Sequence, residues 1–187
     1  MTNDARRKIE GGIFLVLFCL TIPAANWMIG HVGTFCVPNG PCVLPVAPGL
    51  MAPSGVLMIG AALVLRDLVQ RRLGVEYGLA AIVAGAALSA GLAPPSLVIA
   101  SATAFLLSEA ADFAVYTPLA RRRLVLAVLA SSTIGLVVDS FVFLWLAFGS
   151  LDFLGGQIVG KAWMVLLSVP LVAYLRRRDL RLGLNPA

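Results

Sequence analysis

Four ionisable side chains lie within apolar stretches of the sequence that are long enough to cross a membrane: Glu109, Asp112, Asp139 and Lys161. A charged side chain at the centre of a bilayer costs about 2.5 to 3.5 kcal/mol on insertion scales. Such residues usually face a polar cavity, pair with one another, or carry ligands and protons. Their presence favours a membrane transporter or binding protein.

The charges of this set do not balance. Three carboxylates face one ammonium, so at least one carboxylate must be protonated, hydrated or matched by a ligand. A purely structural alternative, in which Lys161 pairs with Asp139 or Glu109, stays open but leaves the surplus unexplained. An excess of acceptors suits a substrate that is rich in N–H donors or carries a cation.

Helical spacing places further polar and aromatic side chains beside these four. A rise of about 1.5 Å per residue, counted from the nearest basic cluster, puts Glu109, Asp139 and Lys161 at one depth near the bilayer midplane. Spacings of three and four residues align Asp112 and Tyr116 with Glu109 on one helix. The predicted substrate-binding residues are Asn26, Ser108, Glu109, Asp112, Tyr116, Asp139, Ser140, Phe143, Gln157 and Lys161.

The elements that must position these residues are membrane-spanning helices. Of the 187 residues, 60% are hydrophobic and 12% charged, and the mean hydropathy is +0.96, which excludes a soluble domain. The apolar runs are continuous rather than alternating, so we expect all ordered structure to be α-helical. The prediction is an all-α integral membrane protein, a single six-helix domain over residues 1–187, with spans at 12–29, 50–65, 77–91, 95–119, 124–148 and 156–175.

Basic residues indicate the orientation of the spans. Thirteen of the 14 Lys and Arg residues fall in four clusters, at 6–8, 66–72, 121–123 and 176–181, on one side of a six-span arrangement. The positive-inside rule then places both termini in the cytoplasm. We expect the clusters, with Arg66, Arg71 and Arg72 among them, to be solvated at the headgroups of the cell inner (plasma) membrane. The pI near 9.6 follows from this topology and does not predict a nucleic-acid partner.

The first span has an alternative interpretation as a signal peptide. Basic residues at 6–8, an apolar core, and the small residues Ala24 and Ala25 fit that layout. We expect a retained span, because its loss would leave an odd number of spans and upset the alternation of charge.

The cysteines divide between the outer loop and the membrane. Cys36 and Cys42 frame a turn-forming Pro-Asn-Gly-Pro sequence that could bring the two sulfurs together, so a disulfide that holds the loop is left open. Cys19 lies in an apolar span and is expected to pack as a small hydrophobe. Since His31 has no carboxylate near it in this loop, we expect no metal site.

Several short motifs together resemble the vitamin uptake transporter family, also described as queuosine precursor transporters. They cover about residues 50 to 175. These motifs are Pro53-Ser54-Gly55 ahead of Asp67, Tyr77-Gly78, Ser108-Glu109 with Asp112 and Tyr116, Ser131-Ser132 with Gly135, Val138-Asp139-Ser140 with Phe143, Ala147-Phe148-Gly149, and Gly160-Lys161. The resemblance implies six spans and import of 7-deazaguanine bases such as 7-cyano-7-deazaguanine (preQ0), its aminomethyl analogue (preQ1) or queuine, for use in tRNA modification.

The residues suit such a purine-like substrate. One carboxylate can accept both the N1 proton and the exocyclic amine of a guanine edge, and the base carbonyl needs a donor. We expect Glu109 or Asp139 to read this edge, Asp112 to act as a supporting or proton-coupled acid, and Lys161 to be counter-ion and donor. Asn26 and Gln157 are alternative donors.

The sequence leaves the energy source and two rival functions open. It has no Walker-type Gly-x-x-x-x-Gly-Lys-Ser/Thr motif, and we expect no enzyme activity and no cofactor. Facilitated diffusion, proton coupling and trapping by incorporation into tRNA all remain open. So do two other functions, a substrate-binding subunit of an energy-coupling-factor vitamin importer and an intramembrane enzyme. Whether two chains form a homodimer is also left open.

Overall fold

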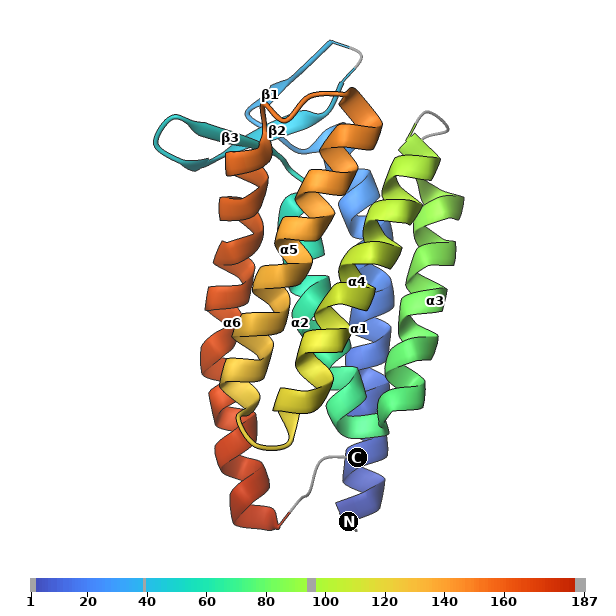
Figure 1. The fold of residues 1–187 in the computed structure, drawn as a ribbon, viewed down its shortest axis with the longest axis vertical. Coiled ribbons are helices and arrows are strands. Elements are labelled where there is room, and N and C mark those ends of the chain that lie inside the picture. Colours follow the sequence, from blue (N-terminus) through green and yellow to red (C-terminus); the bar gives the residue numbers. More distant parts are fainter. Residues whose placement is uncertain (1–2, 39, 94–96, 184–187) are drawn as a thin grey trace.

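A computed structural model describes residues 3–38, 40–93 and 97–183. Within these residues the chain forms six helices that run alternately up and down in one bundle (Figure 1). The first turn of α1 and the last turn of α6 meet at one end, where the Asn3 side chain donates a hydrogen bond to the Leu182 carbonyl at 3.3 Å. The helices are α1 (Asn3–His31), α2 (Val56–Leu73), α3 (Val75–Leu92), α4 (Val98–Ala120), α5 (Leu124–Phe148) and α6 (Leu154–Leu182).

Five of the six described helices are long and apolar enough to cross a membrane, and α2 is the exception. This helix contains Arg66, Asp67, Arg71 and Arg72. It packs against all five other helices and contributes side chains to both buried apolar clusters of the bundle. Unlike its neighbours, α2 shows no large exposed hydrophobic side chain in the described part of the chain. It is therefore the central helix, surrounded by the apolar helices that face lipid.

The helix boundaries agree with the predicted spans to different degrees. The predicted span 124–148 coincides with α5, whereas α1 and α6 extend several residues further towards the basic end. The predicted span 50–65 is displaced, because residues 50–53 form a strand and α2 continues to Leu73. The predicted start of the fourth span at Pro95 lies outside the described residues.

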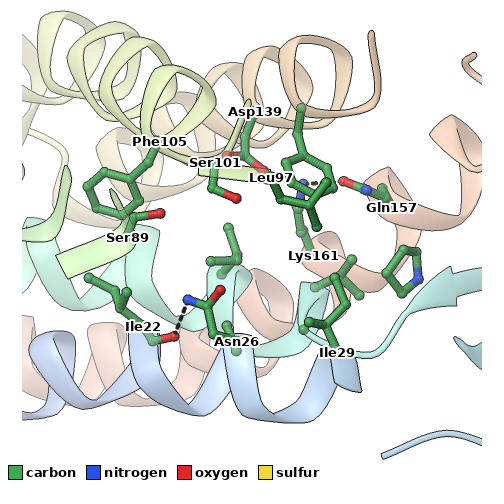
Figure 2. A pocket seen from close by; sticks show the side chains of 16 residues that line it. Ile22, Asn26, Ile29, Ser89, Leu97, Ser101, Phe105, Asp139, Gln157 and Lys161 are labelled. Carbon is green, nitrogen blue, oxygen red and sulfur yellow. Dashed lines mark hydrogen bonds and ion pairs between the residues drawn. The ribbon is translucent and has the colours of Figure 1, made fainter. Parts of the chain in front are cut away.

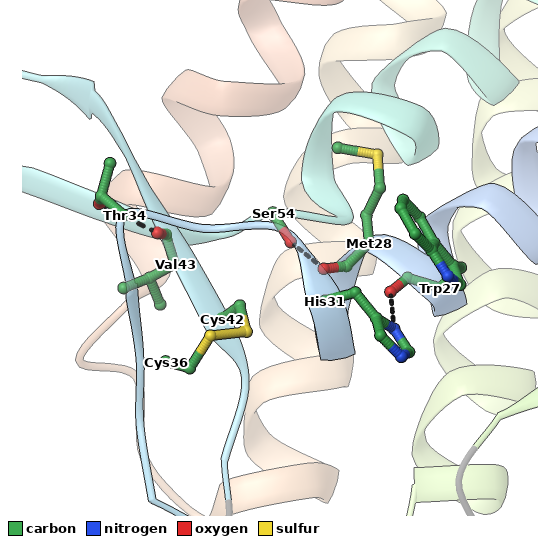
Figure 3. The surroundings of a disulfide bond; sticks show 8 residues. All are labelled: Trp27, Met28, His31, Thr34, Cys36, Cys42, Val43 and Ser54. Atoms are coloured by element: carbon green, nitrogen blue, oxygen red, sulfur yellow. Dashed lines mark hydrogen bonds between the residues drawn. A yellow bond between two sulfur atoms is a disulfide. The ribbon is translucent and has the colours of Figure 1, made fainter.

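The loop between α1 and α2 is a small antiparallel sheet, so the expectation that all ordered structure is helical was wrong here. Its strands are β1 (Phe35–Cys36), β2 (Cys42–Ala47) and β3 (Leu50–Pro53), in the order β1-β2-β3. The loop lies beyond the end of the apolar bundle (Figure 1), and its backbone groups pair in two hairpins. Cys36 and Cys42, which face each other across the first hairpin, form a disulfide (Figure 3).

The sheet is fixed to the ends of two helices. Ser54, which follows β3, donates its hydroxyl to the Met28 carbonyl of α1 at 2.7 Å (Figure 3). Trp163 of α6 donates its ring N–H to the Val46 carbonyl of β2 at 2.9 Å. These contacts hold the start of α2 against α1 and β2 against α6, at the end of the bundle opposite the termini.

Candidate functional site

A buried ammonium ion on α6 is the centre of the first polar cluster. Lys161 is 1% exposed, and its Nζ donates to Asp139 Oδ2 at 2.5 Å, to Ser140 Oγ at 2.8 Å and to Gln157 Oε1 at 2.7 Å. All three N–H donors of the ammonium are thereby used. Ser140 donates its own proton to the Leu136 carbonyl, which leaves its oxygen free to accept from Lys161.

Local sequence positions these groups. Asp139 and Ser140 are adjacent on α5, and Gln157 and Lys161 lie one turn apart on α6. Gly60 lets α2 approach α6 closely, because a Cβ at this position would lie only 2.7 Å from the Lys161 carbonyl oxygen. The close approach of α2 fixes the backbone from which the Lys161 side chain extends towards α5.

The Lys161 cluster lines a cavity in the half of the bundle nearest the sheet (Figure 2). Asn26 of α1 lies across this cavity from Asp139, and its amide group donates to the Ile22 carbonyl at 3.0 Å. The wall is otherwise mainly apolar. The polar side chains that line the cavity are Asn26, Ser89, Ser101, Asp139, Gln157 and Lys161, and the apolar side chains include Ile22, Ile29, Val56, Ile59, Leu97, Phe105 and Phe143.

A second polar cluster surrounds Arg66 of α2, which is fully buried. Its guanidinium contacts Glu109 Oε2 at 2.8 Å, Asp67 Oδ1 at 2.9 Å and Asp112 Oδ1. Gln70 accepts a further hydrogen bond from Arg66 at 3.3 Å. The prediction that Arg66 is solvated at the headgroups is therefore wrong, because α2 is the central helix and its side chains at this level cannot reach water.

The predicted binding residues thus separate into two groups. Asp139, Phe143, Gln157, Lys161 and Asn26 line the cavity, with Ser140 directly behind Lys161. The predicted binding residues on α4 do not line the cavity. Glu109 and Asp112 contact Arg66, Tyr116 has its ring 5.9 Å from the Arg66 guanidinium carbon, and Ser108 donates to the Phe105 carbonyl of its own helix.

Sequence reasoning missed both the base at the centre of the second cluster and part of the cavity wall. The adjacent pair Arg66-Asp67 and the position of Gln70 one turn later signal a polar face on a continuing helix, rather than the end of a span. Ser89 and Ser101, isolated hydroxyls in apolar stretches, were not assigned to the site. Phe105, which contacts Phe18 with ring centroids 6.1 Å apart, completes the wall from α4.

Arg71 and Arg72 form a third cluster, at the end of the bundle that holds the termini. Both guanidinium groups bind the Asp179 carboxylate, Arg71 at 2.7 Å and Arg72 at 2.9 Å. Glu10 of α1 lies 2.9 Å from Arg72 and 2.5 Å from Arg178. Arg71 and Arg72 are 7% and 2% exposed, so they are not the solvated headgroup contacts that we expected. They connect α1, α2 and α6 instead.

A comparison with protein families matches part of the chain. Residues 91–175 match the family model described as "Putative vitamin uptake transporter". The matched region contains α4, α5 and most of α6, and with them Glu109, Asp112, Asp139, Gln157 and Lys161. No curated protein and no solved structure shows a significant match to the chain. The match agrees with the family that the sequence motifs indicated, and residues 91–175 are similar to the vitamin uptake transporter family.

Proposed function

We propose that this protein is a transporter, not an enzyme, that imports a queuosine precursor of the 7-deazaguanine type across the cell inner membrane. The observation that carries the proposal is the cavity beside Asp139 and Lys161, in which a buried carboxylate, an ammonium and two amides line an otherwise mainly apolar wall. A family match to vitamin uptake transporters supports transport as the activity.

The base-reading role belongs to Asp139 in this proposal. Lys161 is the side chain that donates to Asp139 within the described residues, and it uses Oδ2, so Oδ1 can accept from a ligand. A guanine-like edge presents two adjacent N–H donors to a carboxylate, and the apolar side chains around it can contact the flat faces of the ring. Glu109, the other candidate from the sequence, is bound to Arg66 and does not line the cavity.

Two amides supply the remaining hydrogen bonds. Gln157 accepts from Lys161 through Oε1, which leaves its NH₂ group to donate to a base carbonyl. Asn26 lies on the opposite wall and uses its NH₂ group on the Ile22 carbonyl, which leaves its oxygen as an acceptor. The acceptors of Asp139 and Asn26 lie on opposite walls, and the Ser89 and Ser101 hydroxyls can accept as well as donate, so the cavity suits an aminated heterocycle better than a carboxylate-bearing solute.

The proposed topology has six spans, with both termini in the cytoplasm. Five helices meet the requirements for crossing a membrane, and α2 crosses packed against all five of them. The basic residues at 6–8, 121–123 and 176–181 belong to the end of the bundle where α1 begins and α6 ends. The positive-inside rule assigns that end to the cytoplasm, and the cavity then lies in the outer half.

Ligand binding to the purified full-length protein tests the proposal. The probes are 7-cyano-7-deazaguanine, its aminomethyl analogue, queuine and guanine, and the readout is the thermal unfolding temperature. A ligand at one hundred times its dissociation constant stabilises the folded state by about 2.7 kcal/mol. We expect a rise with at least one deazaguanine, its loss in Asp139→Asn, and its retention in Asp152→Asn, a matched change at an exposed site. A wild-type protein that none of the four bases stabilises would contradict the proposed substrate.

A further inference from the structure

The Arg66 cluster holds more carboxylates than its single guanidinium can neutralise. Asp67, Glu109 and Asp112 all contact Arg66, and each is at most 1% exposed. Three ionised carboxylates would leave two uncompensated negative charges in the centre of the bundle. A buried charge without a partner is so costly that the group normally takes up a proton instead.

Two oxygen atoms of the cluster indicate where such a proton lies. Asp67 Oδ1 and Asp112 Oδ2 are buried and have no hydrogen-bond partner in the described part of the chain, although Asp67 Oδ1 is 2.9 Å from an Arg66 nitrogen. The Asp67 and Asp112 carboxyl groups lie against the same guanidinium, Asp67 Oδ1 at Nη1 and Asp112 Oδ1 at Nη2, which brings the two groups side by side. Ionised carboxylates only accept hydrogen bonds, so two of them can bond to each other only when one carries a proton.

The groups around this pair come from three helices. Arg66 is on α2, Glu109 and Tyr116 are on α4, and Ser131 of α5 donates to Asp67 Oδ2 at 3.1 Å. The packing of α5 is close here, since a Cβ added at Gly135 would lie 3.2 Å from Asp112 Oδ2.

One more charged group, Arg71, acts on this cluster. Arg71 of α2 acts electrostatically on Tyr116, whose hydroxyl has no hydrogen-bond partner among the described residues.

An electrostatic connection links this pair to the cavity. Glu109 interacts with Asp112 on its own helix and with Asp139 of α5, and Asp139 lines the cavity beside Lys161. Loss of a proton from the pair would add a negative charge next to Glu109 and change the field at Asp139. Thermodynamic linkage makes the effect reciprocal, so a ligand at Asp139 must change the proton affinity of the pair.

We infer that Asp67 and Asp112 share one proton and that this proton moves together with the substrate, which makes the transporter proton-coupled. The proton site stands on the contacts of the Arg66 cluster alone, and the coupling rests on the proposed function. In this mechanism Arg66 stays charged and holds the three carboxylates together, while the Asp67–Asp112 pair takes up a proton on one side of the membrane and releases it on the other.

Infrared spectroscopy of the purified full chain tests the proton site without any substrate. We expect the carbonyl stretching band of a protonated carboxylic acid at neutral pH, with the shift in D₂O that marks an exchangeable proton. Asp67→Asn and Asp112→Asn should each abolish the band, because asparagine imitates the protonated acid and the two remaining carboxylates, Glu109 and the other aspartate, both contact Arg66. Asp152→Asn is the matched control and should keep it. The proton site is wrong if the wild type lacks the band or if the band survives both substitutions in the cluster.

Transport by the protein in proteoliposomes tests the coupling, with 7-cyano-7-deazaguanine as the probe. We expect accumulation that depends on an inward proton gradient in the wild type. Asp67→Asn and Asp112→Asn should exchange internal for external base but lose gradient-driven accumulation. If uptake by the wild type does not depend on the proton gradient, the coupling is refuted and the proposed function stands. An infrared band without any uptake of the base would refute the proposed function and leave the proton site standing.

Discussion

Asp139 of α5 and Lys161 of α6 form an ion pair, with 2.5 Å between Oδ2 and Nζ, on the wall of a cavity. The pair is nearly buried, since the side chains are 10% and 1% exposed. Breaking such a pair by removing one partner costs about 3 to 5 kcal/mol, because an uncompensated charge is left behind. Replacing both charges with neutral groups costs much less.

A comparison of single and double variants separates the structural from the binding role of this pair. Lys161→Met should lower the free energy of unfolding by about 3 to 5 kcal/mol, since Asp139 loses its counter-ion. Adding Asp139→Asn to Lys161→Met should restore most of the stability but not the binding of the deazaguanine base. Chemical denaturation and thermal shift measure the two properties separately. Equal stability of the single variant and the wild type would show that Asp139 does not depend on Lys161 for its charge balance.

Gly60 should be intolerant of a side chain because α2 and α6 touch at this position. A Cβ there would lie 2.7 Å from the Lys161 carbonyl oxygen and 2.9 Å from its Cα, and both atoms belong to the backbone. Gly60→Ala should therefore destabilise the protein by about 1 to 3 kcal/mol and displace Lys161 from its three acceptors, with loss of base binding.

The matched control for this substitution is Gly12→Ala in α1, where nothing lies within 4 Å of the added Cβ. This change should leave binding intact and stabilise the helix by about 0.5 to 1 kcal/mol. A Gly60→Ala protein with normal stability and binding would refute the close packing of α2 on α6.

The sequence predicted the apolar helices well, but it did not predict that α2 is buried among them. Hydrophobicity and the positive-inside rule assume that a helix with several charges ends where the charges begin, so Arg66 was assigned to the membrane surface. The structure packs α2 against all five apolar helices, and Arg66 is fully buried there among carboxylates. Whether a helix faces lipid or protein depends on tertiary packing, and a single sequence does not contain that information directly.

The candidate site was likewise predicted only in part. Asp139, Ser140, Gln157 and Lys161 were predicted to lie together because helical spacing and equal depth are local properties, and the structure joins them. Glu109 lies at that depth too and interacts with Asp139, but its hydrogen-bond donor is Arg66. Depth along a helix gives one coordinate only, and the face that each helix turns towards its neighbours decides the partner.

Asp179 should be important for stability although it lies far from the cavity. It binds both Arg71 and Arg72 and so ties α6 to α2, while Arg72 and Arg178 also bind Glu10 of α1. Asp179→Asn should lower the free energy of unfolding by about 3 to 5 kcal/mol, because the buried Arg71 loses its carboxylate and the buried Arg72 keeps only Glu10. Raising the salt concentration should change this loss little, since buried pairs are weakly screened.

The control is Asp4→Asn, which removes an ion pair with Lys8 whose side chains are 70% and 73% exposed. Exposed pairs contribute at most about 1 kcal/mol, so this variant should unfold close to the wild type. Equal effects of Asp4→Asn and Asp179→Asn would show that the Arg71, Arg72 and Asp179 contacts are solvated in the membrane-embedded protein.

The disulfide gives a direct test of the proposed orientation. Cys36 and Cys42 pair in the sheet between α1 and α2, whereas Cys19 is a free cysteine within the first apolar helix. In intact cells that have been treated with a reductant, a membrane-impermeant maleimide should label Cys36 and Cys42 from outside. A Cys19→Ala background removes the remaining thiol, and omission of the reductant should abolish the labelling, because disulfide sulfurs do not react. Labelling that requires permeabilised cells would place the sheet in the cytoplasm, reverse the topology, and put the cavity on the inner side of the bundle.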